Sequence, residues 1–166
     1  MLLGQQIAAY ATTFVGRYRY KWGGDTPKTG FDCSGLTSYV YGQYGKVIPR
    51  TAEAQYQAFR PVPKGKEWRG DLVFFHGKKG YVYHVGVYEG DGMMVSAADK
   101  KDGITDVTIW GGTVTFGTIT HLAAGDAACL MSGRPRRCGR PEVRLRHRPG
   151  PHTWTAGWPG GGRWPR

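Results

Sequence analysis

The chain has 166 residues, 40% of them apolar, and its formal net charge is +11. This length suits one domain with a modest additional segment. No stretch approaches the ~20 apolar residues of a membrane-spanning helix, and the three cysteines form neither a disulfide framework nor a paired zinc-binding pattern. These bounds exclude helices that cross a bilayer and a small scaffold held together by disulfides.

The positive charge is concentrated at the C-terminal end. Residues 123–166 hold 9 arginines and 2 acidic residues, and they alternate Arg, Pro and Gly without any apolar period. Such a composition is typical of a disordered segment. We therefore predict a folded domain over residues 1–122 and a disordered basic tail over residues 123–166. The tail's charge suits an anionic polymer, but we favour a solvated extension, and a segment foreign to the native protein is a further alternative. We expect no specific nucleic-acid partner.

The first half of the domain shows helical spacing of its apolar residues. Helices are predicted over residues 2–15, 33–44 and 51–59. Gly16 and Gly45 would end the first two, and Asp32 or Cys33 would cap the start of the second.

The second half of the domain changes to strand patterns after Pro61 and Pro63. Strands are predicted over residues 71–76, 81–88, 93–97, 104–109 and 114–119. Helices followed by a meander of strands indicate an α+β domain, with the N-terminal helices packed on an antiparallel sheet of about five strands.

A cysteine and a histidine stand out as candidates for nucleophilic chemistry. Cys33 lies at a helix start, where the helix dipole favours a thiolate, and an imidazole within reach would take its proton. His84 is the best of five histidines because an unpaired imidazole in an apolar strand is costly, and Gly86, on the same face, would leave room beside it. The alternative is a small buried cysteine and a structural histidine.

Five segments occur in an order that resembles the motifs of NlpC-type cell-wall peptidases, which are papain-like cysteine hydrolases of peptidoglycan stem peptides. They are residues 20–24, 31–36, 48–51 with Gln55, 70–75 and 84–88. Each motif alone is weak, and five in order are specific. The resemblance implies a papain-like fold for residues 1–122 and a catalytic role for this domain.

The resemblance also implies roles for individual residues. Cys33 would be the nucleophile and His84 the base and later the acid. The backbone N–H of Cys33 and the hydroxyl of Tyr20 would stabilise the oxyanion. Asp32 and Ser34 fall in the same motif as candidate oxyanion or substrate-binding residues, although a helix cap explains Asp32 equally well. No close cluster of His, Cys and Asp has metal-ligand spacing, so we expect neither a metal nor a cofactor.

The family usually orients its histidine with a polar side chain, often another histidine, on the next strand. Ser96 holds that place here. A two-residue hairpin loop would put Ser96 and His84 on opposite faces, whereas a three-residue loop over residues 90–92 pairs Gly86 with Ser96 and puts Ser96 diagonal to His84 on one face. We predict the three-residue loop, with Gly92 left-handed, and Asp99 as the alternative orienting residue.

Three functions fit these residues. The favoured one is an endopeptidase that cuts peptidoglycan stem peptides, commonly at the D-glutamyl–diamino acid bond, through an acyl-enzyme on Cys33. An amidase or acyltransferase on another amide or ester would use the same residues, and a degenerate domain would only bind cell wall. The first residues lack the pattern of a secretory signal, so action on the bacterial cell wall would require a phage virion, a holin or a missing leader.

Overall fold

The computed structural model describes residues 2–119, so the predictions about residues 123–166 lie outside the described part of the chain. The elements, in chain order, are α1 (Leu3–Thr12), β1 (Asp25–Thr26), β2 (Gly30–Phe31), α2 (Cys33–Gly42), α3 (Ala52–Ala58), β3 (Arg60–Val62), β4 (Leu72–His76), β5 (Val82–Gly90), β6 (Met93–Asp99), β7 (Gly103–Thr108) and β8 (Thr113–Thr118). Among residues 2–119 no helix is long and apolar enough to cross a membrane, and no three His, Cys, Asp or Glu side chains are grouped to hold a metal ion.

The three predicted helices are present, and α2 and α3 begin at the expected caps, Asp32 and Thr51. α1 stops at Thr12, earlier than expected, and turns carry the chain to Gly16, which has a left-handed φ of 68°. α2 begins at Cys33 because the Asp32 side chain accepts a hydrogen bond from the N–H of Gly35, at 2.7 Å. The cap therefore fixes Cys33 as the first residue of the helix.

The main sheet has six antiparallel strands in the order β3-β8-β4-β5-β6-β7. The five predicted strands are all present, which confirms the α+β class. The prediction missed β3 because Pro61 was taken only as a helix breaker; at the edge of a sheet, beside β8, a proline is tolerated. The strands do not form a simple meander either, since β8 returns to pair with β4.

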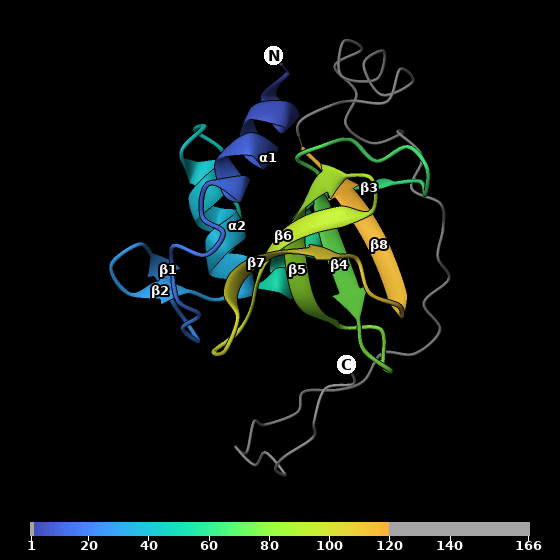
Figure 1. Cartoon of the computed structure of the whole chain (residues 1–166). Coiled ribbons are helices and arrows are strands. Elements are labelled where there is room, and N and C mark those ends of the chain that lie inside the picture. The colour runs from blue at the N-terminus through green and yellow to red at the C-terminus, as the bar shows by residue number, and fades with distance from the viewer. Residues whose placement is uncertain (1, 120–166) are drawn as a thin grey trace.

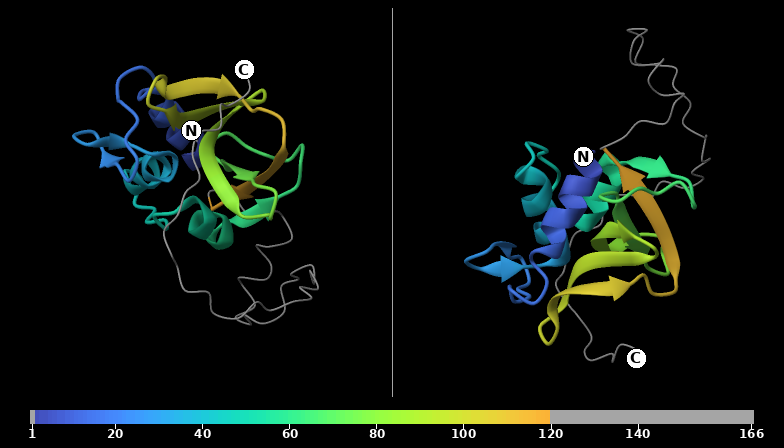
Figure 2. Two further views of the ribbon diagram at one scale, coloured as in Figure 1. Left: turned by 90° about the horizontal axis from the view of Figure 1, so that it is seen from below. Right: turned by 45° about the horizontal axis from the view of Figure 1, so that its top comes forward.

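Both faces of this sheet are apolar. One face packs against α1 and α2 through side chains such as Phe74 and Val85. The other carries Phe75 and Met94, and the sheet rolls up so that side chains at Val107 and Phe116 pack over them. Figure 1 shows β6 and β7 crossing in front of β4 and β5, and Figure 2 shows the helices gathered on one side of the sheet.

The β5–β6 hairpin reaches the predicted register by a different route. Its loop is Asp91 and Gly92 alone, with φ values of 54° and 74°, so the three-residue loop was wrong and the left-handed Gly92 was right. A bulge at Glu89 supplies the extra residue. Val87 therefore pairs with Val95, the register in which Ser96 faces the side of the sheet that carries His84.

The start of α2 is held by a close backbone approach. A Cβ added at Gly35 would clash with the carbonyl oxygen of Gly24. The loop that precedes β1 can therefore lie directly on the helix start only because residue 35 has no side chain.

We predict that Gly35→Ala lowers the free energy of unfolding by about 1–3 kcal/mol, since rigid backbone atoms must move to admit the methyl group. Gly42→Ala is the matched control in the same helix, because a Cβ there meets nothing within 4 Å. It should be neutral or stabilising by up to about 1 kcal/mol. Urea denaturation of both variants measures the difference; equal stabilities would show that the loop yields freely.

Candidate active site

Cys33 places its thiol at the positive end of α2. The backbone N–H groups of Cys33 and Ser34 lie in the first turn, where no earlier carbonyl can accept from them, and both are directed at the sulfur. Burial and the nearby Asp32 carboxylate raise the pKa of the thiol, while these N–H groups and that of Val85 lower it; the net direction is upward. The resting thiol is therefore protonated at neutral pH.

The thiol lies against β5 at a point where the sheet pairing stops. The pairing between β5 and β6 ends at Val87 and Val95. Tyr88 donates its N–H to Asp71 on the other side, so by alternation the N–H of Val85 points away from β4. The hydrogen bond from Val85 goes to Cys33 Sγ instead of to a strand. Cys33 is thus seated on the residue that directly follows His84.

His84 is buried, with 9% of its surface exposed, and is held from the next strand. Its Nε2 lies 2.6 Å from Ser96 Oγ, as the register predicts, while Nδ1 makes no hydrogen bond within residues 2–119. Burial lowers the pKa of His84 from 6.5 to about 4. Asp99 is occupied elsewhere, because its carboxylate accepts from the backbone of the turn that follows it.

Aromatic rings wall the imidazole on the face of the sheet away from the helices. The His84 ring centroid lies 5.6 Å from that of Phe75 and 5.3 Å from that of Trp110. Trp110 stacks on Phe75 at 4.2 Å and is 37% exposed, so it separates the imidazole from solvent. The space expected beside His84 at Gly86 is occupied by Met94 of the neighbouring strand. A Cβ at Gly86 would lie 2.8 Å from Met94 Sδ, so the lack of a side chain there makes room for Met94 and not for His84.

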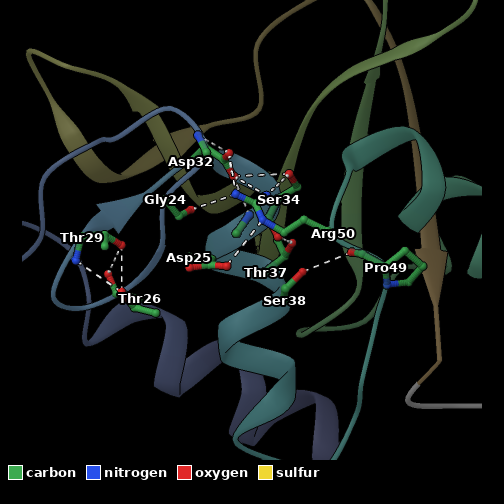
Figure 3. Close-up of polar contacts among 12 residues, drawn as sticks. Gly24, Asp25, Thr26, Thr29, Asp32, Ser34, Thr37, Ser38, Pro49 and Arg50 are labelled. Carbon is green, nitrogen blue, oxygen red and sulfur yellow. Dashed lines mark hydrogen bonds and ion pairs between the residues drawn. The ribbon is translucent and has the colours of Figure 1, made fainter.

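Asp32 is the centre of a charged network at the start of α2 (Figure 3). Arg50 donates from Nη1 to Asp32 Oδ1 at 2.9 Å and from Nη2 to Oδ2 at 2.8 Å, a bidentate pair. The N–H of Gly23 also donates to Oδ2, at 2.9 Å. Ser34 is buried in the same network, where its Oγ accepts from Arg50 at 3.1 Å and lies 3.4 Å from Asp32 Oδ1. Both residues are thus turned into the protein interior.

Tyr20 is placed near Cys33 by a bridge between its backbone and that of Phe31. Burial raises the pKa of its hydroxyl, and the nearby Cys33 and Asp32 raise it further. The hydroxyl is therefore protonated at neutral pH and available as a hydrogen-bond donor at the thiol.

Arg50, Gln55 and Trp110 belong to the site, although the sequence alone indicated no role there for any of them. Arg50 and Gln55 both belong to the third motif, and the Asp32 carboxylate in the second motif pairs with the half-buried guanidinium of Arg50. Gln55 is fully buried and donates to Ser34 O at 3.0 Å and Pro49 O at 2.8 Å, which ties α3 to the start of α2. No pattern near Trp110 pointed to the site, because only the rolling of the sheet brings it to His84.

Helices packed on an antiparallel sheet, with a cysteine at a helix start and a histidine on the strand beneath it, define the papain-like class of α+β domains. Residues 16–119 match the model of the NlpC/P60 family. The chain belongs to this family.

Relatives in other organisms match part of this chain. It is 47% identical over 94 residues to "Probable endopeptidase p60" of Listeria seeligeri (57% of this chain, 17% of that protein). It is 43% identical over 83 residues to the "Bifunctional muramidase/DL-endopeptidase CwlT" of Bacillus subtilis (49% and 25%), and 45% identical over 82 residues to "Murein DD-endopeptidase MepH" of Escherichia coli (47% and 30%). The chain thus spans less than a third of each of these relatives.

A solved structure shows the same fold. The peptidoglycan hydrolase RipB of Mycobacterium tuberculosis superposes with a TM-score of 0.63 and 31% identity, covering 72% of this chain and 65% of that one. The papain-like fold implied by the sequence motifs is thereby confirmed.

We predict that Arg50→Gln lowers the free energy of unfolding by about 1–3 kcal/mol, because it removes charge-assisted hydrogen bonds and leaves the Asp32 carboxylate unpaired. The freed charge beside Cys33 should also raise the thiol pKa, so alkylation of Cys33 by iodoacetamide slows. Arg17→Gln removes the same charge from an exposed position and serves as the control. If both variants behave as wild type, the network does not support the nucleophile.

Burial of neutral His84 should make stability depend on pH. Between pH 6.5 and about 4 the unfolded chain binds a proton that the native imidazole excludes, so the free energy of unfolding falls as pH falls, by up to about 3 kcal/mol. His84→Gln lacks this component. Urea denaturation at neutral pH and near pH 4 should therefore show a larger loss for wild type than for the variant. Equal losses would mean that the native imidazole is already protonated beside a thiolate.

Proposed function

We propose that the domain is a cysteine endopeptidase that hydrolyses peptidoglycan stem peptides. The observation that carries the proposal is the thiol of Cys33 seated on the N–H of Val85, one residue after a histidine whose Nε2 is held by Ser96. Membership of the NlpC/P60 family supports the substrate class, because CwlT and MepH are named endopeptidases and RipB a peptidoglycan hydrolase.

In the acylation step that we propose, His84 acts as the base and Cys33 as the nucleophile. Nδ1 of His84 takes the thiol proton as the sulfur of Cys33 forms a bond to the scissile carbonyl carbon. The carbonyl oxygen becomes an oxyanion and accepts from the N–H of Cys33 and the O–H of Tyr20. When the oxyanion collapses, the C–N bond breaks, the imidazolium gives its proton to the leaving amine, and a thioester remains on Cys33.

Deacylation uses the same groups in reverse. A water molecule attacks the thioester carbon and gives a proton to Nδ1 of His84. The C–S bond breaks, the sulfur regains a proton from the imidazolium, and the carboxylic acid product releases its own proton to solvent and leaves as a carboxylate. Burial keeps both the thiol and the imidazole neutral at rest, so the reaction starts from a neutral pair.

We further propose the D-glutamyl–diamino acid bond as the one that is cut, through the family resemblance and the "DL-endopeptidase" of the CwlT name. MepH is named for DD activity, so relatives of similar identity are named for different bonds. We place the action of the enzyme at the bacterial cell wall. Delivery by a phage virion, by a holin or by a leader remains a prediction.

Mass spectrometry of muropeptides digested by the whole chain tests both levels of the proposal. Wild type should release peptides that end in D-glutamate, and Cys33→Ala should lower the rate by at least about a thousandfold, since it removes the nucleophile. A thermal melt of Cys33→Ala shows whether the fold is retained.

Other outcomes separate the alternatives. Cleavage between two D-residues would replace the proposed bond and keep the enzyme class. Equal lysis by wild type and Cys33→Ala would overturn the catalytic claim and leave a wall-binding module. Intact muropeptides with turnover of another amide would indicate an amidase or acyltransferase.

A further inference from the structure

Thr105 on β7 lies directly opposite the serine that holds His84. Ser96 pairs with Thr105 across the β6–β7 ladder, and residues directly opposite each other in antiparallel strands point to the same face, with Cβ atoms about 4.5–5.5 Å apart. The neighbours confirm the face: Ile104 packs with the helices, while Val107 packs with Met94 on the face that carries His84. Thr105 therefore projects beside Ser96, on the far side from the imidazole.

The hydroxyl of Thr105 is buried and unused. Its Oγ1 has no hydrogen-bond partner among residues 2–119. Ser96 is fully buried, and its hydroxyl makes one hydrogen bond within the same residues, to His84 Nε2. A hydroxyl carries one proton and two lone pairs, so Ser96 still has either a proton or a lone pair to place.

The direction of the His84–Ser96 hydrogen bond decides whether the imidazole can act as a base. If Nε2 carries the proton and donates it to Ser96, Nδ1 keeps the lone pair that the thiol proton needs. If Ser96 donates to Nε2 instead, the proton sits on Nδ1 and the base is blocked. A carboxylate in this place could only accept, whereas a serine can do either. The single contact therefore leaves the tautomer open.

We propose that Thr105 is a positioning residue that fixes this tautomer. Rotation about χ1 brings Thr105 Oγ1 within reach of Ser96, and it accepts the Ser96 O–H proton directly or through one water. Without this second acceptor the buried Ser96 proton can go only to Nε2; with it, Ser96 can accept from Nε2–H, and Nδ1 faces the thiol unprotonated. Thr105 acts through Ser96 and touches neither substrate nor the reacting atoms. Its value for catalysis rests on the proposed function, whereas the tautomer it sets does not.

Nitrogen-15 NMR of the substrate-free chain at neutral pH tests the tautomer. Protonated and unprotonated imidazole nitrogens have well-separated shifts, and His84→Gln identifies the signals. Wild type and Thr105→Ser should show protonated Nε2, and Thr105→Val should shift population to protonated Nδ1. Unchanged His84 shifts in Thr105→Val would overturn the proposal, whether or not the chain cleaves peptidoglycan.

Kinetics on muropeptides supply a second test. Thr105→Val should lower kcat by about threefold to tenfold with KM unchanged, the range expected for one hydrogen bond, and Thr105→Ser should restore it. Thr108→Val, a like change at an exposed position of the same strand, should leave kcat at the wild-type value. In a Ser96→Ala background Thr105→Val should have no further effect. An undiminished effect there would mean that Thr105 acts by another route and would overturn the proposal.

Discussion

The bidentate pair between Asp32 and Arg50 is the interaction on which the rest of the site depends. The Asp32 carboxylate caps α2 and accepts hydrogen bonds from the N–H of Gly23 and from both Nη atoms of Arg50. A buried carboxylate left without these partners would cost several kcal/mol. The pair therefore fixes the helix start, and with it the direction of the thiol. The same carboxylate raises the pKa of Cys33, and the positive charge of Arg50 is paired directly with it.

The contact between Cys33 and β5 depends on incomplete pairing of the sheet. β5 and β6 part beyond Val87, and the N–H of Val85 is left for Cys33 rather than for a strand. Since successive residues of a strand alternate in direction, His84 turns toward the second apolar face while Val85 packs toward the helices. Two consecutive residues of β5 therefore contribute different groups. His84 contributes an imidazole on one face of the sheet, and Val85 contributes an N–H at the edge of β5 that β6 does not pair with.

Much of this arrangement could be predicted from the sequence, and the misses have physical causes. The capping of α2 and the face of Ser96 follow from local rules, because side-chain alternation along a strand is strict. The predicted β5–β6 loop was one residue too long. The bulge at Glu89 supplies that residue within β5, so the pairing of β5 with β6 is the one expected. Arg50 and Trp110 were missed because their partners are distant in sequence: an ion pair and a ring stack are properties of the folded chain.

Ser96 holds the place of the side chain that orients His84, and its neutral hydroxyl limits how it can stabilise the imidazole. A carboxylate would stabilise the imidazolium electrostatically, whereas a serine offers one hydrogen bond and little charge stabilisation. The surroundings of His84 also favour a neutral imidazole. Phe75 and Trp110 contact the ring, and burial lowers its pKa to about 4. Orientation, not basicity, is then the contribution that β6 makes. A site built this way depends on which nitrogen holds the proton, and that is decided by the hydroxyl groups behind the imidazole.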